Sequence, residues 1–195
     1  ENTFPKLLLK HANERASHPA FRQKRLGIWQ TLSWQQTKET TENLSLGLSG
    51  LGLKRGDKTA IIGQNTTMMY LSMLALQSLG GVIVPIFPDA SAEEFQSLLA
   101  HAEIKAVICQ DQEQIDKMES VKKNIKSLEF LIFEQPRGMR DYKQNYIHSI
   151  DELIQAGSRL KGNEESNFED GIMAGEGDDL SIIIYTPGTT GKPKG

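Results

Sequence analysis

The chain has 195 residues, of which 38% are hydrophobic and 24% are charged, and its formal net charge is −3. This balance is typical of a globular chain that is long enough to bury a substantial core. The basic residues are dispersed among acidic ones rather than gathered in one stretch, which argues against a general nucleic-acid binder. Any affinity for phosphate groups must therefore be local to a small part of the chain.

Cysteine content and hydropathy indicate the compartment. The single cysteine, Cys109, cannot form an intramolecular disulfide, which fits a reducing environment, and its apolar neighbours favour a place in the core. No apolar run approaches the roughly 18 residues of a membrane span, and no signal peptide is visible. We expect a cytoplasmic protein, and peripheral contact with a membrane stays open.

The N-terminal third is predicted to contain a helix, a hairpin and a second, longer helix. Thr3 is placed to cap the first helix, which is expected to end at His18-Pro19. Two short strands around a turn at Leu26-Gly27 predict an edge hairpin, because branched and aromatic residues are frequent there. Ser33 and Gln36 form a capping box that starts the longer helix.

Alternating strands and helices are predicted from residue 58 onward. Short runs of branched apolar residues, typical of buried strands, alternate with stretches whose apolar residues recur at helical spacing. Short connections between them imply right-handed crossovers and an α/β fold, a mainly parallel sheet with helices on both faces. The predicted strands are 58–62, 82–86, 106–109 and 128–133, and the helices between them begin at Thr66, Ser91 and Asp111.

The stretch that follows the last of these strands is expected to be mostly irregular. Ser149 is placed to cap a short helix that stops at Gly157. Residues 162–179 contain four glycines and seven acidic residues, which predicts an acidic, mobile linker. Asp178 and Asp179 are candidate metal ligands, but solvated surface charge is the favoured interpretation.

The C-terminal segment carries the clearest chemistry. Residues 180–185 are apolar and predict a buried strand, which places the next loop at a strand's carboxyl end, where open α/β sheets bind ligands. Gly188 and Gly191 let backbone N–H groups approach a ligand closely and form an anion-binding nest. Thr189 and Thr190 add hydroxyl donors. These are the features of a phosphate-binding loop.

Two lysines complete this loop. Lys192 and Lys194 add compact positive charges suited to polyphosphate, and Pro193 stiffens the backbone between them. A Walker loop is excluded, because it needs four residues between its first glycine and the Gly-Lys pair, whereas two separate Gly188 from Gly191. A flexible glycine-rich linker is the simpler alternative, but the whole run after an apolar strand favours phosphate binding.

With the loop and the scaffold described, the sequence resembles the adenylate-forming (AMP-binding) superfamily, and within it most the long-chain fatty-acid–CoA ligases. The loop matches the family's phosphate signature, Thr-Ser-Gly-Thr-Thr-Gly-x-Pro-Lys-Gly, at every fixed position except Pro187. Pro187 replaces the usual small hydroxyl residue and removes one N–H donor. Three further matching stretches extend the similarity over nearly the whole chain: 31–34, 55–61 and 79–88.

The resemblance implies a two-step ligase reaction. A carboxylate, here a fatty acid, attacks the α-phosphate of ATP to give an acyl-adenylate and pyrophosphate, and the thiol of coenzyme A then displaces AMP. Lys192 occupies the variable position of the signature and is expected to be a solvated surface lysine. The positions implied to hold the β- and γ-phosphates of ATP are Thr186, Gly188, Thr189, Thr190, Gly191 and Lys194.

Other parts of the site lie beyond residue 195 in the family: the adenine and acyl pockets, the glutamate associated with Mg²⁺ and the domain with the catalytic lysine. The resemblance therefore implies that residues 1–195 are the N-terminal part of an AMP-binding domain, with residues 180–195 as its strand and phosphate loop. We expect this chain alone to be inactive, and no catalytic residue or metal ligand is assigned within it.

Several alternatives stay open. A fatty-acyl-AMP ligase or another acid:CoA ligase would carry the same loop, and so would a non-catalytic phosphate-binding or interaction module. The oligomeric state cannot be read from the sequence. The histidines fall on different expected elements without the spacing of metal ligands, so no zinc site is predicted. They are His11, His18, His101 and His148.

Overall fold

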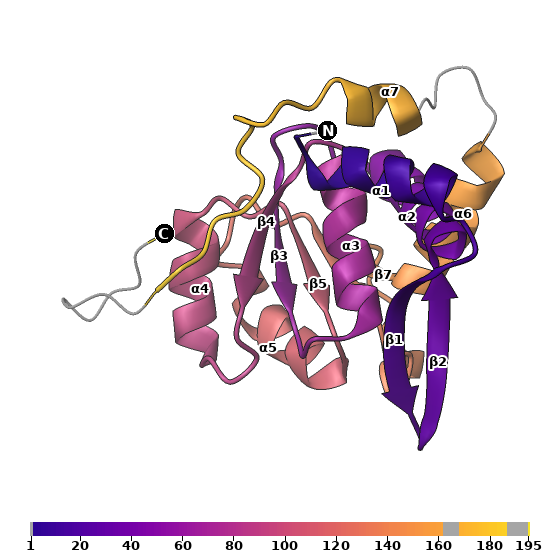
Figure 1. Ribbon diagram of the computed structural model, residues 1–195. Helices are drawn as coiled ribbons and strands as arrows, with labels where there is room; N and C mark the ends of the chain where they lie inside the picture. Colours follow the sequence, from indigo (N-terminus) through magenta and orange to yellow (C-terminus); the bar gives the residue numbers. More distant parts are fainter. Residues whose placement is uncertain (1, 162–167, 187–194) are drawn as a thin grey trace. The chain divides into compact units, whose positions relative to one another are not determined.

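The computed structural model describes residues 2–161, 168–186 and 195 (Figure 1). The chain divides into two compact units, which we name the helical unit and the sheet unit. The helical unit comprises Glu1–Lys54, Asn65–Gly80 and Leu153–Asp179, and the sheet unit comprises Arg55–Gln64, Gly81–Glu152 and Leu180–Gly195.

A parallel five-stranded sheet forms the sheet unit, with strand order β4-β3-β5-β6-β7. The four predicted strands are confirmed, and so is the α/β class with a parallel sheet flanked by helices. β7 was not predicted, because three residues are too few to show a strand period. The strands are β3 (Lys58–Ile62), β4 (Val82–Ile86), β5 (Ala106–Cys109), β6 (Phe130–Phe133) and β7 (Ile147–Ser149).

Two helices pack on this sheet and supply its core. α4 (Ala92–His101) and α5 (Gln112–Lys122) begin at the predicted caps, Ser91 with its capping box and Asp111. Phe95, Leu99, Ile115 and Met118 are fully buried against strand residues such as Val84 and Val107. Cys109 is buried in the same core, as predicted. A short 3-10 helix, η1 (Met139–Asp141), lies between β6 and β7.

Among the described residues, the helical unit packs α1, α2, α3, α7, most of α6 and a hairpin around its own core. Thr3 caps the first helix as predicted, but that helix ends at Glu14 rather than at His18-Pro19, because Arg15 leaves the helical conformation. The capping box of Ser33 is present. The elements are α1 (Phe4–Glu14), β1 (Pro19–Arg25), β2 (Ile28–Ser33), α2 (Trp34–Leu51), α3 (Thr67–Ser78), α7 (Phe168–Met173) and most of α6 (Ile150–Leu160).

Helix α6 does not stop at Gly157, where the sequence predicted its end, but continues to Leu160. Gly157 is instead a packing residue, since a Cβ atom there would lie 1.7 Å from the carbonyl oxygen of Asn43 in α2. A second close approach of the same two helices involves Gly47 of α2. A Cβ atom on Gly47 would lie 2.1 Å from the carbonyl oxygen of Leu153 in α6. Two glycines therefore let the backbones of α2 and α6 approach each other.

The predicted acidic linker needs a correction in its central part. Residues 162–167 lie outside the described residues, but Phe168–Met173 form helix α7. Phe168 and Ile172 are buried and pack with Leu46 of α2. The acidic composition of residues 162–179 hid this helix, because two apolar side chains four residues apart are enough to fix a single short helix on a core.

The close approach of α2 and α6 gives a stability prediction. Gly157→Ala forces a methyl group against the Asn43 carbonyl, so we expect the free energy of unfolding to fall by about 2 kcal/mol. Ser158→Ala is the matched control, because Ser158 is the exposed neighbour on the same helix and should change stability by no more than about 0.5 kcal/mol. Chemical denaturation measures both, and equal stability of the two variants would contradict the packing role of Gly157.

Candidate phosphate-binding site

The segment that leads into the predicted loop lies along the free edge of β4. Ile182 forms a parallel bridge with Ile83, whose amide donates to the Ser181 carbonyl at 3.0 Å and whose carbonyl accepts from the Ile183 amide at 2.9 Å. The prediction of a buried strand over residues 180–185 was wrong in its burial and extent. Leu180 and Ile184 are about 60% exposed, and among the described residues the segment is joined to β4 through the bridge between Ile182 and Ile83.

The parallel direction of this pairing determines where the loop begins. Because Ile182 lies opposite Ile83, the residues that follow run toward the carboxyl end of β4, which is Ile86. In open parallel sheets, ligands bind beyond the carboxyl ends of the strands. The predicted phosphate loop therefore starts at the edge of the sheet where a ligand is expected.

The two ends of the predicted loop meet at Tyr185. A Cβ atom on Gly195 would lie 2.8 Å from the Tyr185 ring and 2.9 Å from a methyl group of Ile183, so a side chain here would force a neighbouring group to shift. The Tyr185 hydroxyl is 2.7 Å from Nδ1 of His101, at the end of α4, and the two rings meet edge to face. Partial burial raises the pKa of the Tyr185 hydroxyl, which therefore stays protonated at neutral pH.

Of the six residues predicted to bind phosphate, the structure describes one. Thr186 is exposed and directly follows the Tyr185 anchor. The other five, Gly188, Thr189, Thr190, Gly191 and Lys194, lie outside the described residues, as do Pro187 and Lys192. Their assignment stays a prediction. What the structure adds is that Gly195 lies beside Tyr185, a proximity of the residues that flank the loop which the sequence reasoning did not predict.

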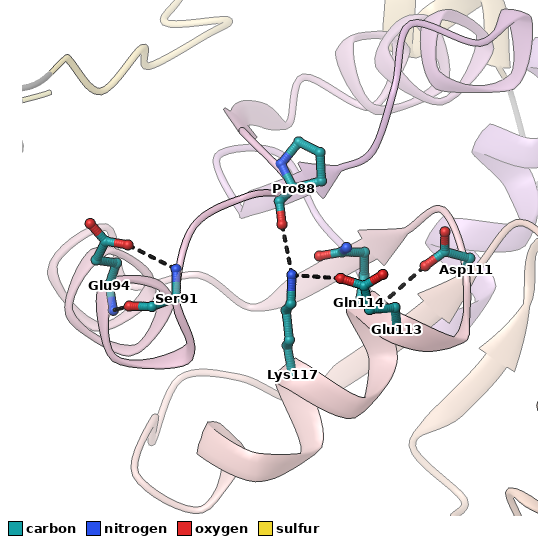
Figure 2. Close-up of polar contacts among 7 residues, drawn as sticks. All are labelled: Pro88, Ser91, Glu94, Asp111, Glu113, Gln114 and Lys117. Carbon is teal, nitrogen blue, oxygen red and sulfur yellow. Dashed lines mark hydrogen bonds and ion pairs between the residues drawn. The ribbon is translucent and has the colours of Figure 1, made fainter.

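The loop after β4 is fixed by a charged side chain from α5 (Figure 2). Lys117 donates to the carbonyl of Pro88 at 2.8 Å and pairs with Glu113, one turn away on its own helix, at 2.9 Å. The capping box of Ser91 and Glu94 then starts α4 directly after this loop. β4 is the strand that pairs with Ile182, so the loop at its carboxyl end borders the candidate site. The hydrogen bond from Lys117 fixes the position of this loop.

The loop that follows β3 is also fixed by a side-chain hydrogen bond. The amide of Gln64 donates to Oε1 of Gln110 at 2.7 Å, and a Cβ atom on Gly63 would lie 2.7 Å from Cβ of Gln110. Gly63 and Gln64 directly follow β3, so this loop lies at the carboxyl end of a strand. Gln110 follows β5 directly, so its polarity after an apolar strand was the one sequence signal that could have identified it.

Metal-binding and nucleophilic groups are the other chemistry that the described residues bear on. Ranges 2–161, 168–186 and 195 contain no group of three or more His, Cys, Asp or Glu side chains that could hold a metal ion. The Asp179 carboxylate accepts from the Glu176 amide at 2.9 Å, which closes a turn. Burial, helped by the charge of Asp111, raises the pKa of the Cys109 thiol well above its usual range, so Cys109 is no nucleophile. Within the same part of the chain, no helix is long and apolar enough to cross a membrane.

Comparison with curated proteins gives relatives that are ligases. The chain is 28% identical over 195 residues to the human long-chain-fatty-acid–CoA ligase ACSBG2, covering 99% of this chain and 28% of that protein. It is 25% identical over 172 residues to the rat long-chain-fatty-acid–CoA ligase ACSBG1, covering 88% of this chain and 23% of that protein. The chain thus spans less than a third of the length of these relatives.

Solved structures share the fold. The inhibitor-bound N-terminal domain of FACL13 from Mycobacterium tuberculosis superposes with a TM-score of 0.77 at 20% identity, covering the whole of this chain and 43% of that chain. The anthranilate CoA ligase AuaEII in complex with anthranoyl-AMP superposes with a TM-score of 0.72 at 19% identity, covering 97% of this chain and 33% of that chain. At these identities the likeness is one of fold.

A family comparison covers both the scaffold and the loop. The sequence model described as "AMP-binding enzyme" matches residues 8–195, which is nearly the entire chain and includes the whole Gly-Thr-Lys segment. Together with the parallel sheet and the edge position of the segment before the loop, this match shows that the chain belongs to the AMP-binding enzyme family.

Proposed function

We propose that the whole protein to which this chain belongs activates a fatty acid with ATP, forming an acyl-adenylate and then an acyl-CoA thioester. The observation that carries the proposal is the parallel pairing of Ile182 with the edge strand β4, which directs the chain toward the carboxyl end of that strand directly before the Gly-Thr-Lys sequence. The family match and the ligase names of the curated relatives support the same reaction class.

In this proposal the loop binds the part of ATP that leaves. The backbone N–H groups around Gly188 and Gly191 and the hydroxyls of Thr189 and Thr190 donate to the β- and γ-phosphate oxygens. Lys194 offsets the negative charge that grows on pyrophosphate as the carboxylate oxygen bonds to the α-phosphorus. Preorganised donors of this kind act mainly by positioning and by charge stabilisation. Thr186, exposed at the start of the loop, is placed to add a hydroxyl donor.

Two further groups enter the reaction from solution. The thiol of coenzyme A attacks the acyl carbon and releases AMP in the second step. ATP is expected to enter with Mg²⁺, but the described residues do not provide a set of ligands for this ion. No step is therefore assigned to a metal held by this chain, and the proposed contribution of the loop is to bind and orient phosphate.

Lys194 and Lys192 provide a matched pair of variants. In the whole protein, Lys194→Ala should lower the rate of acyl-adenylate formation at least about tenfold, because one preorganised positive charge is lost from the transition state. Lys192→Ala should leave the rate within about twofold, since a solvated lysine contributes little. ATP–pyrophosphate exchange measures the first step alone. Normal exchange by Lys194→Ala, or equal losses in both variants, would remove the role of Lys194.

The contact between Gly195 and Tyr185 is testable in the same assay. Gly195→Ala places a methyl group against the Tyr185 ring, which displaces one end of the loop, and kcat/KM for ATP should fall roughly tenfold or more. Ser181→Ala on the same segment is the control, because Ser181 contributes its backbone carbonyl to the edge pairing. If Gly195→Ala keeps the ATP dependence of the parent protein, the closure of the loop ends does not matter for activity.

The substrate class and the acceptor require a separate experiment. The whole protein should release pyrophosphate with saturated carboxylates of increasing chain length, and should form thioesters only when coenzyme A is present. Adenylate formation without any thioester would indicate a fatty-acyl-AMP ligase, and a preference for short or aromatic acids would indicate another acid:CoA ligase. Tight binding of ATP and pyrophosphate without turnover by the whole protein would indicate a non-catalytic phosphate-binding module.

A further inference from the structure

The tip of the β1–β2 hairpin exposes three large apolar side chains within four residues. Leu26 is 94% exposed, Ile28 is 70% exposed and Trp29 is 65% exposed. Figure 1 shows this turn at the free end of the hairpin, away from the end that leads into α2. Large apolar side chains exposed singly are common on protein surfaces, but a cluster of three marks an interaction surface.

One face of the hairpin is anchored to α3 and the other is open. The Phe21 ring stacks on Tyr70 at 6.1 Å, and Oε1 of Gln23 accepts from the Thr67 amide at 2.8 Å. Residues on a strand alternate between faces, so Arg22 and Lys24 lie on the opposite face. Lys24 is directly across from Trp29 in the register. The open face therefore presents the Trp29 indole ring opposite Lys24, with Arg22 two residues away along β1 and opposite Thr31.

The charge of the hairpin is opposite to that of the chain. Residues 19–33 contain Arg22, Lys24 and Arg25 and no acidic residue, which gives +3, whereas the chain as a whole has 22 basic and 25 acidic residues, which gives −3. The exposed apolar tip is therefore bordered on its β1 side by the positive charge. A partner for this surface must combine negative charge with an apolar layer beneath it.

The turn itself is not optimised for folding. Leu26 and Gly27 have φ values of 48° and 82°, so both loop residues lie in the left-handed region, as in a type I′ turn. Asparagine followed by glycine is the favoured pair for this turn, and a leucine at its first position costs free energy. A strained leucine that is also almost fully exposed contributes little to the hairpin, which favours a role in binding.

We propose that the tip of the β1–β2 hairpin docks on an anionic lipid bilayer, with Leu26, Ile28 and Trp29 in the boundary between headgroups and acyl chains. Arg22 and Lys24, on the face of Trp29, and Arg25, next to the turn on the face of Ile28, then lie near the lipid phosphates on both sides of the tip. Tryptophan prefers this boundary, and each basic residue near an anionic surface adds to the attraction. The surface lies in the helical unit and goes beyond the proposed ligase function, because docking needs neither ATP nor a carboxylate.

Vesicle flotation with the full chain tests this proposal. The probes are vesicles of phosphatidylcholine alone and vesicles that also contain phosphatidylserine. We expect binding to the anionic vesicles that weakens as salt is raised, and much weaker binding to the neutral ones. Leu26→Asn should lower the partition coefficient about tenfold. Lys24→Gln and Arg25→Gln should each lower it about fivefold on anionic vesicles only.

The controls separate docking from folding. Leu26→Asn is suited to a type I′ turn, so its unfolding midpoint should equal or exceed that of the parent chain. Phe4→Gln removes an exposed aromatic ring from α1 and should leave flotation unchanged. Absence of flotation, or equal flotation by Leu26→Asn and the parent chain, overturns the proposal. Sedimentation velocity gives the other outcome: if vesicles are not bound and Leu26→Asn dissociates an oligomer, the tip is a protein–protein contact.

Discussion

The two backbone hydrogen bonds of Ile83 join the candidate site to the sheet. In a parallel strand, successive residues direct their amide and carbonyl groups to opposite neighbours. Ile83 directs both of its groups to the segment before the loop, bonding Ser181 and Ile183, while the adjacent Val82 donates to Asp57 at the start of β3. The side chain of Ile83 is fully buried. The position of the phosphate loop thus depends on a residue that belongs to the core.

This dependence bears on the proposed binding of phosphate by a loop that is rich in glycine. Glycine gives the backbone the freedom to surround an anion, at the cost of more conformational entropy when the loop becomes ordered. Holding the two ends reduces that cost, because fewer arrangements remain to be lost on binding. Ile83 fixes the start of the segment, and the contact between Tyr185 and Gly195 brings the far end back to it. His101 in turn contacts the Tyr185 hydroxyl.

The sequence predicted those parts of the fold that local signals determine. Capping residues such as Ser33 and Ser91 act within four residues, and buried parallel strands form apolar runs, so both could be read directly. β7, α7 and the true end of α6 depend on contacts with residues far away in the chain. In the sequence, Gly157 is typical of a residue that ends a helix. The closeness of the Asn43 carbonyl in the structure shows that Gly157 instead allows two helices to pack closely.

The type and spacing of glycine, threonine and lysine in the loop predict phosphate binding without tertiary information, and that assignment stays a prediction. The residues that support the surroundings of the loop could not be predicted. The residues that hold the surroundings, such as Lys117 on the Pro88 carbonyl and Gln110 on the Gln64 amide, are ordinary polar residues in the sequence. Their partners lie 29 and 46 residues away, so no local pattern marks them.

Charge distribution connects the two proposed surfaces. A chain with a net charge of −3 repels anions on average, so both polyphosphate and anionic lipid must be bound where basic residues and backbone donors are concentrated. The hairpin meets this condition in the helical unit and the loop at the edge of β4 meets it in the sheet unit. Because the two surfaces share no residue, loss of one should leave the other intact. The two proposals are linked by the solubility of the proposed substrate, because each additional methylene of a fatty acid strengthens its partition into lipid, where the hairpin is proposed to dock.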